Sequence, residues 1–197
     1  SRARPSVKHG RSSDAPAAMA RGIFSERIGS MLQGGFTSVL GAQSRDDLLG
    51  EVVRFARQLG FDTVSATTVI DHMLGESEFI ALHNSPDSYV DEFENESSMK
   101  RDPVMQHCKR QSVPIIWNQD TYVAAGLGEK WEAQARYGFR TGIALALHLP
   151  EGRHFFMGVD RDQSLPASPG EVTRLVAELQ LFAVHALGAG QRVLLPA

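Results

Sequence analysis

Hydrophobic residues recur at helical spacing in two long segments of the chain. In the first, Ser44 precedes Asp47 by three residues, which is a capping-box start, and Gly60 is a suitable end. In the second, residues 168–171 open a helix, and Gly188 follows its last apolar position. The apolar positions of this second helix are Val172, Leu175, Val176, Leu179, Phe182, Ala183, Ala186 and Leu187. We therefore predict amphipathic helices over about 45–59 and 169–187.

Alternating patterns predict four strands in two pairs. Thr63–Ile70 and Glu78–His83 form the first pair, and residues 71–77 join them. Thr141–Leu149 alternates most regularly, with large apolar residues on one face and small residues on the other. Glu151 and Gly152 then form a turn, so residues 153–159 should return as a hairpin partner.

The remaining segments are shorter and flank these strands. Asp102 followed by Pro103 is a good N-cap and first helical residue. We predict short helices over 24–32, 86–96, 103–111 and 128–137, an extended piece over 113–117, and a polar loop over 118–127. Helices around hairpin-linked strands indicate an α+β fold, with a largely antiparallel β-sheet sandwiched between helices in an α-β-α sandwich.

Composition narrows the class of protein. The 197 residues are 42% hydrophobic and 22% charged, which is typical of a globular protein. Cys108 is the only cysteine, so an internal disulfide or a cysteine zinc site is excluded, which fits a reducing cytoplasm. We find neither an uninterrupted apolar run of the ~20 residues that span a membrane nor a signal-peptide pattern. We therefore expect a cytoplasmic protein without membrane contact.

Charge argues against nucleic-acid binding by these residues themselves. The formal net charge is −3, whereas phosphate binding needs a clustered positive surface. Residues 1–22 are basic and rich in Ser, Pro and Ala, and we interpret them as a flexible tail. A basic arm that reaches toward nucleic acid is the alternative interpretation of this tail.

Four landmarks in the central half carry a family resemblance. They are residues 102–104 (DPV), 114–117 (PIIW), 131–133 (WEA) and 137–143 (YGFRTGI), followed by the hairpin with Gly152 at its turn. In this order and spacing they resemble the autoinducer-binding domain of LuxR-type quorum-sensing transcription regulators. The coarse resemblance extends over residues 24–190, with specific motifs in the central half alone.

This resemblance implies partners and a domain organisation. Such domains hold an acyl-homoserine lactone between an antiparallel sheet and a layer of helices. Ligand occupancy then favours a homodimer, and DNA is bound through a C-terminal helix-turn-helix domain. We therefore expect a sensor domain over residues 23–190 and the start of a linker over 191–197, with the DNA-binding domain missing from this chain.

The resemblance also assigns ligand-binding roles to polar and aromatic residues. Asp102 matches the residue that accepts a hydrogen bond from the ligand amide. Asp before Pro at a helix start is also a good N-cap, and both roles can hold because a carboxylate has about four acceptor sites. Trp117 matches the aromatic residue at the lactone end of the pocket, and Trp131 an aromatic residue beside it. A core position is the alternative for each tryptophan.

Small residues leave volume on one face of the strand Thr141–Leu149. Gly142 and Ala144 lie on this face, and Gly158 of the partner strand extends it in the expected register. Such volume is filled by a ligand or by a closely packed helix.

Several positions depart from the family pattern. Tyr89 stands where a tryptophan usually donates to the lactone carbonyl, and Phe93 stands where a tyrosine hydroxyl is expected. Gly158 replaces a usual Ser or Thr, and Gln134 replaces a small alanine. Each lost donor leaves a ligand acceptor unpaired at about 1–3 kcal/mol. The alternative hypothesis is therefore a ligand-independent dimerisation or protein-interaction module of an orphan regulator.

Other chemistries have little support in the sequence. His107 and Cys108 are neighbours on one helix and point about 100° apart, so this histidine cannot readily activate that thiol. His83 and His148 could meet across strands, but a single pair is not a metal site. Nucleotide-binding glycine motifs are absent from the sequence. We expect no catalysis, no metal and no cofactor.

Overall fold

The computed structural model describes residues 36, 38–71 and 77–194, which belong to one compact unit, Phe36–Ala197. The helix expected over 24–32 and the tail over 1–22 lie outside the described residues. The elements are η1 (Ser38–Gly41), α2 (Arg45–Gln58), β1 (Thr63–Ile70), β2 (Glu78–His83), α3 (Asp87–Phe93), α4 (Glu96–Arg101), α5 (Pro103–Arg110), β3 (Ile115–Trp117), α6 (Gln119–Ala124), α7 (Gly128–Ala135), β4 (Thr141–Leu149), β5 (Arg153–Arg161) and α8 (Pro169–Leu194).

The five strands form one antiparallel sheet in the order β2-β1-β5-β4-β3. Ile143 of β4 lies opposite Val159 of β5, and the hairpin between these strands turns at Glu151 and Gly152, both with positive φ. Because side chains alternate along a strand, this register places the small residues of β4 and β5 on the same face. The predicted α+β fold with a largely antiparallel sheet is confirmed.

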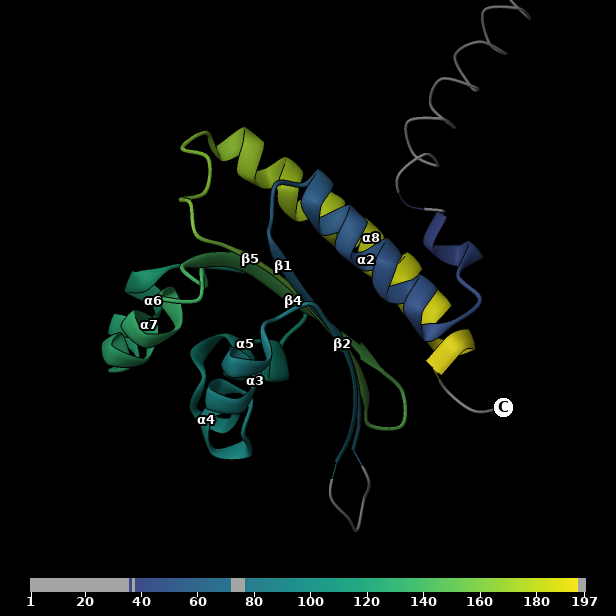
Figure 1. Ribbon diagram of the computed structural model, residues 1–197, viewed down its shortest axis with the longest axis horizontal. Coiled ribbons are helices and arrows are strands. Elements are labelled where there is room, and N and C mark those ends of the chain that lie inside the picture. Colours follow the sequence, from purple (N-terminus) through teal and green to yellow (C-terminus); the bar gives the residue numbers. More distant parts are fainter. Residues whose placement is uncertain (1–35, 37, 72–76, 195–197) are drawn as a thin grey trace, which may run out of the picture. The chain divides into compact units, whose positions relative to one another are not determined.

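One face of the sheet is covered by α2 and α8, which lie side by side across it (Figure 1). Phe55 of α2 stacks on Phe182 of α8, with ring centroids 3.8 Å apart and planes at 4°. Ile143, Met157 and Val159 of the sheet are fully buried beneath these helices. This face forms the larger hydrophobic core of the described chain.

Helix α8 is long and apolar enough to span a membrane by length and composition alone. It is the one such helix among the described residues. Its Leu179, Phe182 and Ala186 recur at helical spacing and are buried in the core. Arg174 and Glu178 pair on its outer side, with 3.7 Å between Nε and Oε1. This amphipathic pattern is typical of the core helix of a globular domain.

The opposite face of the sheet is covered by the short helices α3 to α7 (Figure 1). Ala144 and Ala146 of β4 face this layer, and Val104 and Cys108 of α5 pack against them. Cys108 is buried and free, and burial together with the charge of Asp102 raises the pKa of its thiol to about 12. Cys108 is therefore a neutral, buried side chain of this layer.

Three of the predicted boundaries were wrong. Residues 118–127 were expected to be a loop, but Asn118 and Thr121 form a capping box that begins α6. The expected single helix over 86–96 ends at Phe93, and Asn95 caps a separate helix, α4. Helix α8 continues through Gly188 to Leu194, because packing of its buried face outweighs the low helix propensity of glycine.

The start of α2 gives a first testable prediction. The Ser44 side chain accepts from the Asp47 backbone amide, and the Asp47 carboxylate accepts in return from the Ser44 amide, each at 3.1 Å. Ser44→Ala should lower the free energy of unfolding by about 1 kcal/mol, the usual cost of losing an N-cap. Urea unfolding with an unchanged m value measures it, and a loss below ~0.3 kcal/mol would contradict the capping role.

Candidate ligand-binding site

The centre of the small-residue face is Gly142 of β4, between Trp117 of β3 and Asp160 of β5. A Cβ atom at this position would lie 2.5 Å from the Val159 carbonyl oxygen, 2.6 Å from Trp117 Nε1 and 2.7 Å from Asp160 Oδ1. Only glycine therefore fits here. Its absent side chain lets the indole N–H and the carboxyl oxygen approach the same point over the sheet.

Asp160 adds a titratable group to this point. Burial raises the pKa of its carboxyl group to about 8, and the nearby Asp102 and Glu94 carboxylates add to this shift because they disfavour a further negative charge. Asp160 is therefore substantially protonated near neutral pH and can donate a hydrogen bond. Sequence reasoning missed this residue, because its position at the end of an alternating strand gives no local signal.

Asp102 is buried at the start of α5 and uses both carboxylate oxygens. Oδ1 accepts from the backbone amides of Val104 at 2.9 Å and Met105 at 3.2 Å, which is the predicted N-cap. Oδ2 accepts from Lys130 Nζ at 2.8 Å and from the Tyr122 hydroxyl at 3.1 Å. A carboxylate has about four acceptor sites, so these four donors occupy all of them.

Lys130 brings a positive charge into this layer from α7. Its side chain is only 15% exposed, and it also donates to the Ser98 carbonyl oxygen at 3.1 Å. A pocket of about 330 Å³ opens beside it. The pocket is lined by Glu92, Phe93, Asn95, Ser97, Ser98, Arg101, Leu127 and Lys130. Phe93 and Lys130 thus connect the buried Asp102 network with the surface.

Aromatic rings fill the layer beside this network. Tyr89 stacks on Phe139, with centroids 3.8 Å apart, and also on Phe93 at 5.0 Å. Burial is the main cause that raises the pKa of the Tyr89 hydroxyl, with smaller contributions from nearby carboxylates. Trp117 is 4% exposed and meets Tyr122 edge to face at 5.6 Å. Tyr89 and Trp117 therefore lie in one layer with Tyr122, whose hydroxyl donates to Asp102.

The space over Ala144 and Gly158 was expected to hold a ligand or a closely packed helix, but an aromatic ring of the sheet itself lies there. Ala144 and Gly158 lie opposite each other in the β4–β5 register. A Cβ atom on Gly158 would lie 3.1 Å from the Phe156 ring and 3.7 Å from Ala144 Cβ. The volume left by Gly158 is thus occupied by the ring of a residue on its own strand, two positions earlier.

Trp131 lies at the edge of this layer. Its Nε1 donates to the Arg140 carbonyl oxygen at 3.0 Å, and the Arg140 guanidinium lies 5.5 Å from the centroid of its ring. The side chain is half-buried and packs against the aromatic cluster from outside. This geometry favours the packing alternative for Trp131.

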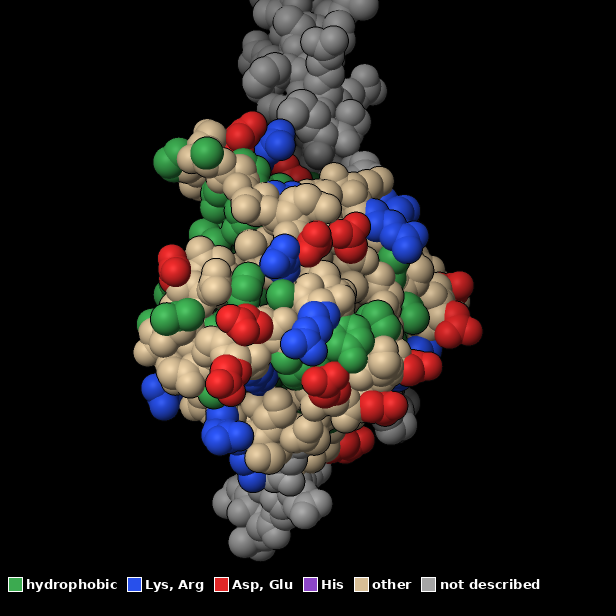
Figure 2. All heavy atoms as spheres, turned by 60° about the vertical axis from the view of Figure 1, so that its left-hand side comes forward, with side chains coloured by type: hydrophobic (Ala, Val, Ile, Leu, Met, Phe, Trp, Pro, Cys, Tyr) green, Lys and Arg blue, Asp and Glu red, His purple; other side chains and the backbone are tan. Residues whose placement is uncertain are grey.

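Four further residues of this layer were not anticipated as site residues. Tyr122 was placed in a loop, and its helical position follows from the Asn118 capping box. Lys130, Phe139 and Phe156 reach the layer through tertiary packing, for which the sequence has no local signal. The side of the molecule on which α6 and α7 lie shows acidic, basic and apolar side chains interspersed (Figure 2).

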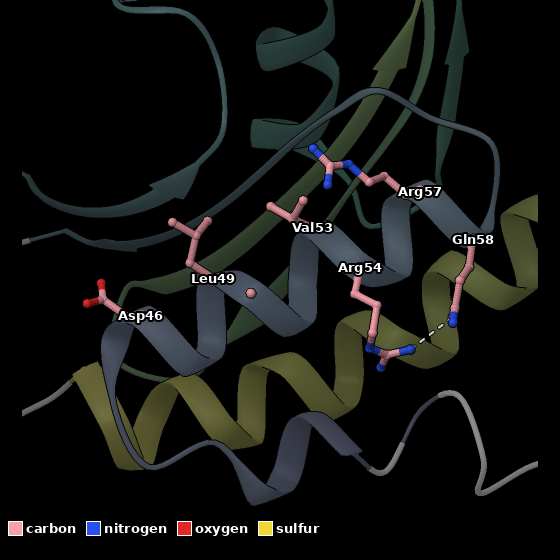
Figure 3. A pocket seen from close by; sticks show the side chains of 7 residues that line it. Asp46, Leu49, Val53, Arg54, Arg57 and Gln58 are labelled. Carbon is pink, nitrogen blue, oxygen red and sulfur yellow. Dashed lines mark hydrogen bonds between the residues drawn. The ribbon is translucent and has the colours of Figure 1, made fainter.

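A second hollow, of about 740 Å³, lies along the outer side of α2 (Figure 3). Leu49 and Val53 form its apolar floor, and Arg54 donates to Gln58 at 3.0 Å along its edge. It lies over the helix that covers the opposite face of the sheet. It is therefore separate from the Gly142 site.

Comparisons with known proteins agree with this architecture. A profile described as the autoinducer binding domain matches residues 44–189. The transcriptional activator protein AhyR of Aeromonas hydrophila is 26% identical over 123 residues, which cover 60% of this chain and 46% of AhyR. The chain thus spans about half the length of the curated relatives it matches.

Solved structures share the fold. Escherichia coli SdiA superimposes with a TM-score of 0.68 at 22% identity, over 87% of this chain and 68% of SdiA. A structure of SdiA in complex with octanoyl-rac-glycerol gives the same TM-score at 23% identity, over 86% of this chain and 66% of that one. CepR2 from Burkholderia cenocepacia, an N-acylhomoserine lactone dependent LuxR family factor, gives 0.63 at 19% identity, over 84% and 94%.

Fold and comparisons together define a domain of the autoinducer-binding class, which is a class of transcription regulators and not of enzymes. The chain belongs to the autoinducer-binding domain family of LuxR-type regulators.

Proposed function

We propose that the chain is the signal-sensing and dimerisation half of an intracellular LuxR-type regulator in quorum sensing. The signal is an acyl-homoserine lactone or another small amphiphile, bound between the sheet and α3 to α7. DNA is bound through a domain outside this chain. The observation that carries the proposal is the buried layer in which Trp117, Tyr122 and Tyr89 pack with Ala144 and Ala146 of β4, and in which Asp102 accepts from the Tyr122 hydroxyl.

In this proposal the polar head of the signal lies near Gly142. Trp117 Nε1 and Asp160 Oδ1 both lie within 2.7 Å of the position that a Cβ atom of residue 142 would take, so the indole N–H and the protonated carboxyl group are candidate donors to a lactone or ester carbonyl. An amide N–H of the signal would take the place of Tyr122 or Lys130 on Asp102 Oδ2. The acyl chain would displace the stacked rings, with a gain of about 0.8 kcal/mol per buried methylene.

One observation favours the second candidate, a ligand-independent dimerisation or interaction module. The polar groups of the layer are already hydrogen-bonded within the chain, and its apolar space is already filled by side chains of the chain. Asp102 has four donors, and the Phe156 ring occupies the space over Gly158. A domain whose interior is satisfied in this way folds without a signal, and its dimer would then form without one.

Thermal unfolding with a ligand panel separates the two candidates. The panel contains acyl-homoserine lactones of varied chain length and octanoyl-rac-glycerol. A bound signal at 100 times its dissociation constant adds ~2.7 kcal/mol, and each kcal/mol raises the midpoint by roughly 2–4 °C at this size. We expect a rise of about 5–10 °C for at least one member.

Two tyrosine variants provide the matched control. Tyr89→Phe removes a hydroxyl inside the layer and should reduce the ligand-induced rise, while the ring stack with Phe139 remains. Tyr137→Phe removes a hydroxyl that donates outward to Glu92 at 2.9 Å and should leave the rise unchanged. A cooperative transition that no panel member shifts would favour the ligand-independent module.

A further inference from the structure

Two histidines stand directly opposite each other where the β4–β5 hairpin approaches its turn. His148 and His154 are cross-strand partners, and their Nδ1 atoms lie 3.0 Å apart. The ring centroids are 4.8 Å apart, with planes at 80°. The expected pair of His83 and His148 does not form, because β1 and β5 lie between their strands.

The outer nitrogen of each ring is held by a group that can only accept. His148 Nε2 lies 3.0 Å from the Cys108 carbonyl oxygen, and His154 Nε2 lies 2.9 Å from Asp71 Oδ2. The hydrogen bond from Ser77 at 2.6 Å, with that from His154, lowers the pKa of Asp71 despite partial burial, so Asp71 is a carboxylate. Both imidazoles therefore carry hydrogen on Nε2.

This arrangement directs two lone pairs at each other. A neutral imidazole with hydrogen on Nε2 has its lone pair on Nδ1, and here the two Nδ1 atoms are within hydrogen-bond distance. Two facing lone pairs repel unless a cation lies between them. A shared proton would remove this repulsion, and so would a metal ion that both nitrogens bind.

We propose that His148 and His154 form a chelating site for a divalent transition metal, with Cu²⁺ preferred. With metal–nitrogen bonds of about 2.05 Å, nitrogens 3.0 Å apart subtend about 94° at the metal. This angle fits the cis positions of tetragonal Cu²⁺ or octahedral Ni²⁺ better than tetrahedral Zn²⁺. Acceptors on the outer N–H groups orient metal-binding histidines in the same way in known sites.

A metal ion can reach the two histidines from solvent, and few other protein ligands lie nearby. His148 is exposed, and the His154 and Asp71 side chains are 29% and 46% exposed. Among the described residues no group of three or more His, Cys, Asp and Glu could hold a metal, so the described part of the chain supplies the two Nδ1 atoms as ligands. Lys109 lies near enough to Asp71 to lower its pKa, and its charge opposes the metal.

Metal binding at this pair involves no redox step. The metal forms one bond to each Nδ1 lone pair, and any proton that the two nitrogens share leaves to solvent. Asp71 and the Cys108 carbonyl keep their bonds to the outer nitrogens. The ion would then link the end of β1, the β4–β5 hairpin and α5.

Titration of the chain with Cu²⁺ tests the site, with glycine as a competing chelator and without an added histidine tag. Electron paramagnetic resonance of the one-to-one sample should show coupling to two imidazole nitrogens. His148→Gln and His154→Gln should each weaken binding at least about tenfold. Asp71→Asn keeps both ligands and should weaken binding by about 10–100-fold, the usual effect of losing such an outer partner.

His185→Gln is the matched control, because His185 is a half-buried histidine on α8 whose Nδ1 bonds the Leu181 carbonyl oxygen of its own helix at 2.8 Å. It should leave Cu²⁺ affinity unchanged. Equal affinity in His148→Gln, His154→Gln and the parent chain would overturn the proposal, as would the absence of imidazole coupling. The two histidines would then form a hydrogen-bonded pair without a metal, whatever the outcome of the ligand panel.

Discussion

Asp102→Ala is expected to lower the free energy of unfolding by about 3 kcal/mol, because the substitution leaves a buried ammonium unpaired. The Asp102 and Lys130 side chains are 13% and 15% exposed, so water cannot replace the lost carboxylate fully. The variant also loses the cap of α5 and the partner of the Tyr122 hydroxyl. Urea or thermal unfolding measures the loss, which corresponds to a midpoint roughly 6–12 °C lower.

A second substitution separates the charge effect from the cap. Asp102→Ala combined with Lys130→Met removes both charges and should recover stability relative to Asp102→Ala alone, since an apolar pair replaces an unpaired ion. Lys130→Met alone should also destabilise, because Asp102 is then the unpaired charge. If Asp102→Ala cost less than ~1 kcal/mol, the carboxylate would be dispensable to the fold.

Gly142→Ala is expected to destabilise the sheet by about 3 kcal/mol, the upper range for overpacking a well-packed interior. The new methyl group would lie 2.5 Å from the Val159 backbone oxygen, and a strand backbone cannot yield as a flexible side chain can. Trp117 Nε1 and Asp160 Oδ1 are also within 2.7 Å of the new atom. We expect a lower unfolding midpoint and a changed Trp117 fluorescence.

Gly50→Ala is the matched glycine control. Gly50 lies inside α2, and a Cβ atom there would have no neighbour within 4 Å. Alanine at a helix interior should stabilise by roughly 0.5–1 kcal/mol relative to glycine. If Gly142→Ala lowers the free energy of unfolding while Gly50→Ala raises it, the loss at Gly142 comes from the contacts of the added methyl group. A neutral Gly142→Ala would mean that β4 and β5 can separate without cost.

Local signals explain which parts of the fold could be predicted from the sequence. The Ser44 capping box, the alternation of Thr141–Leu149 and the Asp102 N-cap each involve residues within a few positions of one another. Each was confirmed with correct or nearly correct bounds. The α6 helix was missed although Asn118 and Thr121 carry a local signal, because polar residues and glycine suggested a loop.

The candidate site was less predictable, because its partners are distant in sequence. Asp102 meets Lys130 across 28 positions, and neither residue indicates the other. The pairing of His148 with His154 depends on strand order, which alternation alone does not determine. The small face of β4 was identified correctly, but the Phe156 ring beside Gly158 depends on a rotamer and not on periodicity.

The single sheet separates two hydrophobic cores, and this has a consequence for how such a domain can change over time. Leu145 faces α2 and α8, whereas its neighbours Ala144 and Ala146 face the short helices. Because distant sites with no shared partners contribute nearly additively, substitutions beneath α3 to α7 leave the larger core almost unperturbed. A lineage can therefore exchange one chemical signal for another through successive mutations on the smaller side, while the larger side keeps the protein folded throughout.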